Sequence, residues 1–118
     1  MRAIRGAACL QADDATEMCE AVGELLTEMM AKNNVTKDDV VSILFTGTPD
    51  LHSTFPATAA RELDLADVPL ICAQEMDVTG AMQRVIRVMM HVNISTARAD
   101  IKHIYIRGAQ ALRQDIAQ

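Results

Sequence analysis

Apolar residues recur every three or four positions over residues 15–30. This spacing predicts an amphipathic helix, because positions three and four apart lie on one helical face. Asp13 and Asp14 stand where an N-cap and a favourable first-turn charge belong, and an Asn-Asn pair at 33–34 ends the run. Such a helix must bury its apolar face against other elements, which the remaining sequence has to supply.

Most of the other apolar segments have strand patterns. Residues 2–10 and 102–107 alternate between two faces, and residues 40–46 and 68–73 are short apolar runs typical of buried strands. Residues 84–92 also fit a helix, but their β-branched content favours a strand. The two faces of that strand would carry Ile86, Val88, Met90 and Val92 on one side, and Val85, Arg87, Met89 and His91 on the other.

Turn signals separate these segments. Residues 36–39 begin with threonine and end with aspartate, which predicts a short capped turn, and residues 47–55 read as a loop. Residues 56–63 predict a helix with proline at its first position, and residues 74–80 read as a polar loop. We therefore expect a single domain over residues 1–118, of the α+β class, with a mixed β-sheet packed with helices.

The composition permits a core and suggests association. Of the 118 residues, 50% are hydrophobic, but only Phe45, Phe55 and Tyr105 are aromatic, so aliphatic side chains and the eight methionines must fill the interior. A domain of this size buries a modest fraction of its surface, and contact with other copies would add to its stability.

The charge distribution limits the classes of partner. The net charge is −5, from 16 acidic and 11 basic residues, whereas nucleic acids and anionic membranes favour a basic surface. Eight of the 11 basic residues are arginine, which suits planar, bidentate recognition of carboxylates. An acidic protein with arginine at a few internal positions can still bind a small anion.

The cysteines bear on the compartment. Cys9, Cys19 and Cys72 show no close paired spacing, and an odd number without a disulfide framework suits a reducing environment. The first ten residues are too polar for a secretory signal, and no apolar run approaches the roughly 20 residues that cross a bilayer. These features favour the cytoplasm.

Generic catalytic motifs leave few candidates. The sequence has no glycine-rich nucleotide-binding loop, nucleophile elbow or zinc-protease motif. His52, His91 and His103 lie on different elements, which disfavours a shared metal site. Cys72 lies on an apolar strand, where a cysteine is more often buried and inert than nucleophilic.

Arg5 and Arg87 are more informative, because each interrupts a mostly apolar strand. Such an arginine must reach solvent, pair with a carboxylate or line a polar cavity. Glu75 and Asp77 offer partners for a structural ion pair, so the pattern leaves that interpretation open beside an anion site. Composition and periodicity do not name a reaction.

Literal strings carry a more specific signal. The segments TPDLHSTFPATAAREL (48–63) and VPLICAQEMDVTG (68–80) closely resemble the monofunctional chorismate mutases of the Bacillus-like AroH class. Shorter strings of that family follow in the same order with similar spacing, from about residue 2 to residue 115. They are IRGA (4–7), IRVMM (86–90), HIYI (103–106) and LRQD (112–115).

The resemblance implies a homotrimeric pseudo-α/β-barrel with active sites at the subunit interfaces. It also implies the rearrangement of chorismate to prephenate in aromatic amino acid biosynthesis, without metal or cofactor. Arg5 matches the arginine near the ring hydroxyl and a carboxylate, and Glu75 matches the acceptor for that hydroxyl. Arg87 matches the arginine on the breaking ether oxygen, and Tyr105 matches a tyrosine that binds a carboxylate.

Further positions match residues of the family that line, enter or cover the pocket. They are Phe55, Ala57, Thr58, Arg61, Leu70, Cys72, Leu112 and Arg113. The family often has lysine in place of Thr58, which puts electrostatic capture of the substrate in doubt more than the chemistry. It commonly has proline in place of Gln114, so the C-terminal segment that covers the site is also expected to differ.

Two other functions remain compatible with the sequence. One is a non-catalytic trimeric module that binds a small anion, since small α+β folds serve unrelated functions. The other is an enzyme acting on a different cyclic enol ether or dicarboxylate, with Thr58 as the mark of its altered specificity. The intact catalytic set argues against pure binding, which would not require it.

Overall fold

The computed structural model describes residues 1–116, and the side chains of residues 1–112. A five-stranded sheet with the order β3-β2-β4-β1-β5 forms its centre. β4 runs antiparallel to both of its neighbours, and the edge strands β3 and β5 run parallel to theirs, so the sheet is mixed as predicted. The strands are β1 (Arg2–Cys9), β2 (Val40–Gly47), β3 (Leu70–Gln74), β4 (Val85–Val92) and β5 (Ile104–Ile106).

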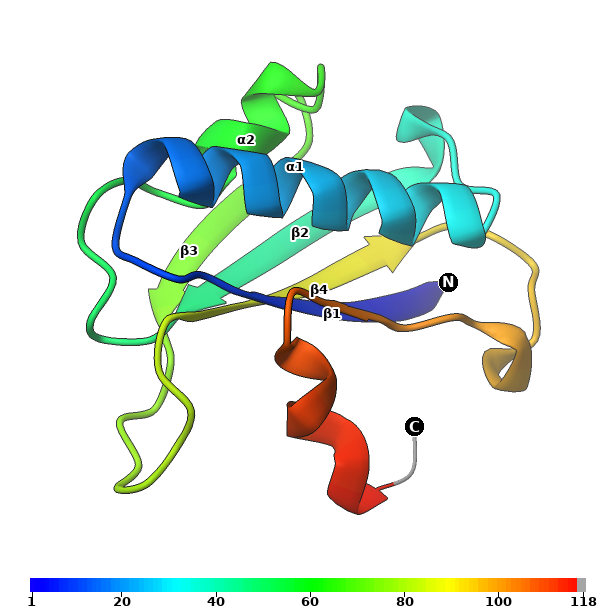
Figure 1. Ribbon diagram of the computed structural model, residues 1–118. Helices are drawn as coiled ribbons and strands as arrows, with labels where there is room; N and C mark the ends of the chain where they lie inside the picture. The colour runs from blue at the N-terminus through cyan, green and yellow to red at the C-terminus, as the bar shows by residue number, and fades with distance from the viewer. Residues whose placement is uncertain (117–118) are drawn as a thin grey trace.

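The two α-helices lie together on one face of the sheet (Figure 1). They are α1 (Ala15–Lys32) and α2 (Ala57–Glu62). Within residues 1–116 there are also three short 3₁₀ helices, namely η1 (Lys37–Asp39), η2 (Arg98–Asp100) and η3 (Ala109–Ile116). Among the described residues, no helix is long and apolar enough to span a membrane.

Polar side chains fix both ends of α1. The Asp14 carboxylate accepts a 2.8 Å hydrogen bond from the backbone N–H of Glu17, which caps the N-terminus as the sequence predicts. At the other end, the buried Asn33 amide donates to the carbonyls of Met29 and Lys102 at 2.8 and 2.9 Å. The Asn33 side chain also accepts from the Lys102 N–H at 2.8 Å, which ties this end of α1 to the segment before β5.

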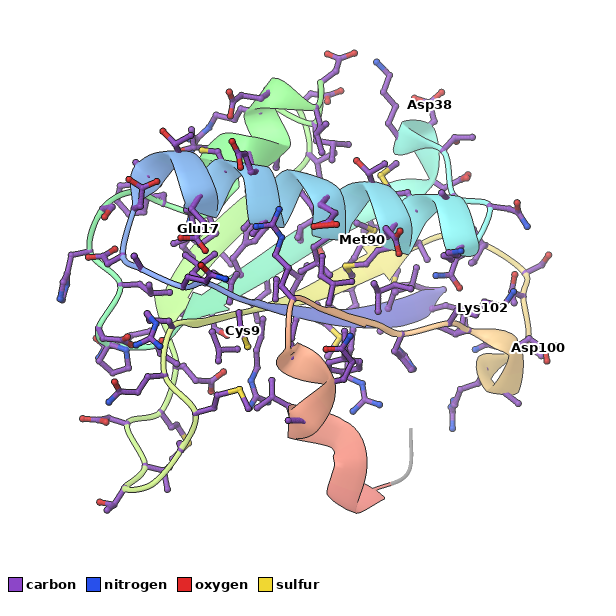
Figure 2. The ribbon with its side chains drawn as sticks, in the orientation of Figure 1. Cys9, Glu17, Asp38, Met90, Asp100 and Lys102 are labelled. Carbon is purple, nitrogen blue, oxygen red and sulfur yellow. The ribbon has the colours of Figure 1, made fainter. Side chains whose placement is uncertain are left out.

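The core lies between α1 and the sheet. Met90, labelled in Figure 2, is one of the sheet residues enclosed there. The alternation predicted for β4 is confirmed, because its even-numbered residues are buried and Arg87 is exposed on the opposite face. The core residues of α1 are Met18, Ala21, Val22, Leu25, Leu26 and Met29, and those of the three central strands include Ile4, Ile43, Phe45, Ile86, Val88 and Val92.

α1 approaches the sheet most closely at Gly6. A Cβ atom at this position would lie 2.5 Å from Met29 Sδ, 3.0 Å from Leu25 Cδ1 and 3.3 Å from the Ile104 carbonyl oxygen. Glycine is therefore needed at this point for space, and it sets how closely the helix packs on β1.

Two predicted boundaries on either side of β3 are wrong by one or two residues. β3 begins at Leu70 rather than at Val68, because the Val68 N–H is used in a turn with the Leu65 carbonyl. Gln74, which we expected in the following loop, still pairs with Gly47 of β2. The loop therefore starts at residue 75.

Two other expectations also need correction. Pro56 is the N-cap of α2 rather than its first helical residue, although its backbone is already helical. Arg84, expected to begin a strand, has φ of 53° and directs its N–H to the Asp50 carboxylate at 3.1 Å. β4 therefore starts one residue later, at Val85.

The face of the sheet away from α1 is partly covered by η3, which extends from it in Figure 1. Ala109 of η3 packs with Ala7 and Val85 in a second, smaller cluster, and Tyr105 and Leu112 are half-buried against it. This cluster holds η3 beside the polar side chains of the same face.

We predict opposite effects for alanine at two glycines. Gly6→Ala should lower the free energy of unfolding by about 1–3 kcal/mol, since the methyl group overpacks the contact with Met29. Gly23→Ala, on α1 with nothing within 4 Å of its Cβ, should raise it by about 0.5–1 kcal/mol. Urea unfolding measures both changes in free energy. A Gly6→Ala variant as stable as wild type would show that Met29 and Leu25 can move aside without cost.

Candidate active site

The sheet register brings four residues into one row on the face away from α1. Arg87 on β4 pairs with Ala7 on β1 and with Thr46 on β2, and Ala7 pairs with Tyr105 on β5. Because side chains alternate along a strand, directly paired residues share a face. The row therefore runs from Tyr105 through Ala7 and Arg87 to Thr46.

A second row lies next to the first on the same face. Arg5 pairs with Met89, and Met89 pairs with Leu44. Side chains of both rows, together with Glu75 from the loop after β3, line a hollow of about 240 Å³. The structure thus brings together four residues that the sequence singled out, namely Arg5, Glu75, Arg87 and Tyr105.

Glu75 is held in the hollow by three contacts. Its Oε2 accepts a hydrogen bond from Thr46 Oγ1 at 3.0 Å and lies 3.2 Å from Arg87 Nε. Its backbone N–H donates to the Gly47 carbonyl at 2.8 Å, which fixes the start of the loop on the end of β2. The carboxylate therefore has a defined position relative to the guanidinium.

The structural ion pair that the sequence left open is present between Arg87 and Glu75. Its side chains are 48% and 27% exposed, so solvent screens the attraction, and such pairs typically contribute about 0.2–1 kcal/mol. Among the residues that line the hollow, two arginines face one carboxylate. Guanidinium groups are well suited to binding the carboxylates of an anionic ligand.

Arg5 and Tyr105 are positioned by their strands and by η3. The Arg5 backbone N–H donates to His103 Nδ1 at 2.9 Å, which joins β1 to the residue that precedes β5. Tyr105 packs against the cluster that contains Ala7 and Ala109, so its ring is held on one side.

A second hollow, of about 640 Å³, lies between β3 and the loop of residues 48–56. Phe55 and Cys72 both line it, and Phe55 is 67% exposed. Cys72 pairs with the buried Phe45, so it faces the helices and not the row that contains Arg87. Two of the predicted substrate-binding residues therefore belong to a separate hollow within one chain.

The other predicted binding residues lie in several places. On α2, Ala57 is buried, Arg61 is exposed and Thr58 Oγ1 is 3.5 Å from Thr54 Oγ1. Leu70 is half-buried against the main core, and Leu112 against the smaller cluster. The Arg113 side chain lies outside the described ones. One chain therefore brings together the four positions that were predicted to be catalytic. Six of the predicted binding positions, those from Phe55 to Cys72, lie on the α2 and β3 side.

The loop of residues 48–56 is anchored by hydrogen bonds along its length, in addition to the contact between Asp50 and the Arg84 N–H. Near its start, the Thr48 N–H donates to the Val85 carbonyl, and the Val85 N–H donates to Thr48 Oγ1, both at 3.1 Å. Further on, Asp13 accepts from the backbone N–H groups of His52 and Ser53, both at 3.0 Å. The hydroxyl of Ser53 also donates to Asp13, and these bonds lower the pKa of that carboxyl.

Sequence reasoning missed Thr46, although its hydroxyl orients Glu75. The alternation along residues 40–46 could have placed Thr46 on the face opposite Phe45. Among the described residues, no group of three or more histidine, cysteine or acidic side chains could hold a metal ion. The three cysteines are free thiols.

Fold and site together define a small α+β protein with an arginine-lined hollow on one face of a mixed sheet. Comparison with known families is more specific. The family described as chorismate mutase type I matches residues 1–116, and the chain belongs to this family.

Individual relatives agree with this assignment. The chain is 41% identical to chorismate mutase AroH of Bacillus subtilis (strain 168) over 118 residues, covering 99% of this chain and 93% of the relative. It is 38% identical to chorismate mutase AroH of Thermus thermophilus over 117 residues, covering 98% and 96%. A solved chorismate mutase from Clostridium thermocellum matches with a TM-score of 0.92 and 44% identity, covering 94% of this chain and 99% of that one.

We predict that the Arg87–Glu75 pair contributes little to stability. A double-mutant cycle with Arg87→Met and Glu75→Gln should give a coupling of about 0.2–1 kcal/mol in urea unfolding, because both side chains are partly exposed. A coupling above about 2 kcal/mol would mean that the pair is chiefly a structural ion pair.

Proposed function

We propose that the chain converts chorismate to prephenate, a step in the biosynthesis of phenylalanine and tyrosine. The observation that carries the proposal is the fixed Arg87 guanidinium beside Glu75, in a hollow that Arg5 and Tyr105 also line. Membership of the chorismate mutase type I family and the names of the relatives support it. The family match over residues 1–116 also supports a single catalytic domain.

The reaction asks for little conventional catalytic chemistry. It is a pericyclic rearrangement, in which one C–O bond breaks while one C–C bond forms, so it needs no nucleophile and no proton transfer. The protein has two tasks. It must hold the flexible enolpyruvyl arm over the ring, and it must stabilise the charge that develops as the bonds exchange.

Arg5 and Tyr105 carry the first task in this proposal. Chorismate has two carboxylates, and a guanidinium can hold a carboxylate through two parallel hydrogen bonds. A phenol can donate to the second carboxylate. Glu75 accepts the hydrogen bond of the ring hydroxyl, which orients the ring without any transfer of a proton.

Arg87 carries the second task. C–O cleavage runs ahead of C–C formation, so negative charge builds on the ether oxygen. A guanidinium fixed there stabilises the transition state more than the substrate. Arg87 is suited to this, because its backbone lies on the central strand and its Nε lies 3.2 Å from Glu75. The guanidinium has further N–H donors that can serve the substrate.

The complete site is proposed to form between copies in a homotrimer. Six of the predicted binding residues, from Phe55 to Cys72, lie on the α2 and β3 side of one chain, away from the hollow that contains Arg87. Leu44 and Ile71 pair on the face away from α1, where they are 37% and 65% exposed. A second copy that covered these apolar side chains would bring its own binding residues to the hollow.

The free thiols at three separated positions support a cytoplasmic location, which we propose for this protein. Electrostatic attraction of the substrate to the pocket should be weaker than in relatives that have lysine in place of Thr58. Here the position carries a hydroxyl that lies 3.5 Å from Thr54 Oγ1, not a cation.

We predict that purified protein consumes chorismate without added metal or cofactor. Loss of ultraviolet absorbance follows the reaction, and acid conversion of the product to phenylpyruvate identifies prephenate. Replacing Arg87 with citrulline should lower kcat by about 10²–10³, since one charge-stabilising donor is worth about that factor. Arg98→Gln, which removes the same charge from η2 outside this hollow, is the matched control and should stay within twofold of wild type.

The same assay separates the alternatives. Binding of chorismate or prephenate without turnover would favour the anion-binding module. Faster turnover of isochorismate than of chorismate would favour the enzyme of altered specificity. A citrulline variant with unchanged kcat would refute the role of Arg87.

We also predict a trimer in sedimentation equilibrium at concentrations where the enzyme is active. The Arg87→Ala and Phe55→Asp variants should each be inactive alone. After the two are mixed and exchange subunits, part of the activity should return, because some interfaces then combine a native Arg87 from one copy with a native Phe55 from its neighbour. A fully active monomer, or no recovery in mixed trimers, would contradict a shared site.

A further inference from the structure

Asp13 lies in a braced turn between β1 and α1. The Glu17 carboxylate, labelled in Figure 2, accepts hydrogen bonds from the backbone N–H groups of Gln11 and Ala12, at 2.6 and 3.2 Å. The next residue, Asp14, caps α1. Residues 11–14 are therefore fixed to the first turn of α1, and these contacts hold the backbone of Asp13 in place.

One oxygen of Asp13 gathers the contacts to the loop of residues 48–56. Its Oδ1 accepts from the His52 N–H at 3.0 Å, the Ser53 N–H at 3.0 Å and the Ser53 hydroxyl at 2.7 Å. Ser53 Oγ also lies 2.8 Å from the Asp13 carbonyl oxygen, to which the same hydrogen can be directed instead. These residues lie two or three positions before Phe55.

The segment held in this way belongs to the second hollow. His52, Ser53 and Phe55 all line it, as Cys72 does. Phe55 is 67% exposed, so the packing of its own ring does little to fix its position. The hydrogen bonds from residues 52 and 53 to Asp13 therefore constrain where Phe55 lies, together with the 3.1 Å bond that the Phe55 carbonyl accepts from the Thr58 N–H at the start of α2.

We propose that Asp13 is a positioning residue of the active site, which holds residues 52–55 so that Phe55 is presented to the substrate. This inference rests on the proposed function, in which Phe55 forms a pocket wall. Asp13 acts only through the loop and does not touch the substrate. Its carboxylate is not among the groups that line the hollow that contains Arg87.

A purely structural role for Asp13 is the alternative, since it adjoins the N-cap of α1. Asp14→Ala provides the matched control, because it removes the cap contact to the Glu17 N–H, while the Glu17 carboxylate still accepts from Gln11 and Ala12 and so still braces the turn that carries Asp13. Both variants should lower Tm. Only loss of the Asp13 contacts should change how substrate is bound.

The experiment measures kcat, KM and Tm for wild type, Asp13→Ala, Asp13→Asn, Ser53→Ala and Asp14→Ala, with chorismate as substrate. Asp13→Ala should lower kcat/KM by about ten- to a hundredfold, mostly through KM, because misplacing a positioning element by about 1 Å has effects of that size. Asp13→Asn should recover much of the loss, since its amide oxygen can accept the same bonds. Asp14→Ala should stay within twofold of wild type.

The Ser53 variant tests whether the two residues act together. Ser53→Ala should have a smaller effect in the Asp13→Ala background than in wild type, because the contact has already been lost. The proposal is overturned if Asp13→Ala keeps kcat/KM within twofold, or if Asp14→Ala loses as much activity as Asp13→Ala does. Wild-type protein that leaves chorismate unchanged would refute the proposed function itself, and this inference with it.

Discussion

Leu25 and Met29 of α1 reach the sheet at the one point of β1 where Gly6 offers no side chain. This close approach lets a single long helix cover the central strands and, with α2, complete the core on one face. Because the apolar residues are used on that face, the opposite face is free to carry polar ones. The arrangement of the site depends on this division, since both of its arginines are on the face away from α1.

An arginine on a central strand is costly unless its charge is satisfied or reaches solvent. Arg87 satisfies this condition in two ways, because it is partly exposed and lies against Glu75. Glu75 is in turn held by Thr46 and by the end of β2. The same contacts that make the charge tolerable also fix its position, and a fixed position is what electrostatic stabilisation of a transition state requires.

The sequence was sufficient for the α+β class and for the type of each main element. The β-branched residues correctly decided the strand at 85–92, and Asp14 and Asn33 marked the ends of α1. It could not reveal that Asp13 reaches a loop 39 residues away, since no local pattern encodes that contact. The strand starts predicted at Val68 and Arg84 were wrong for a similar reason. In each case the backbone N–H bonds to a residue in a turn or loop and not to a neighbouring strand. For the site, pattern alone gave candidate arginines, and the family resemblance supplied their roles.

Arg87 and Glu75 belong to parts of the chain with different resistance to local opening. The backbone of Arg87 lies in a strand that is paired on both sides, so freeing it requires the sheet to come apart. Glu75 lies just beyond the end of an edge strand, where a few hydrogen bonds hold it. Fluctuations of low free energy can therefore release the carboxylate while the backbone that carries Arg87 stays in place. In the mechanism proposed above, the hollow can thus loosen around the substrate at the Glu75 side while the strand that carries Arg87 stays intact.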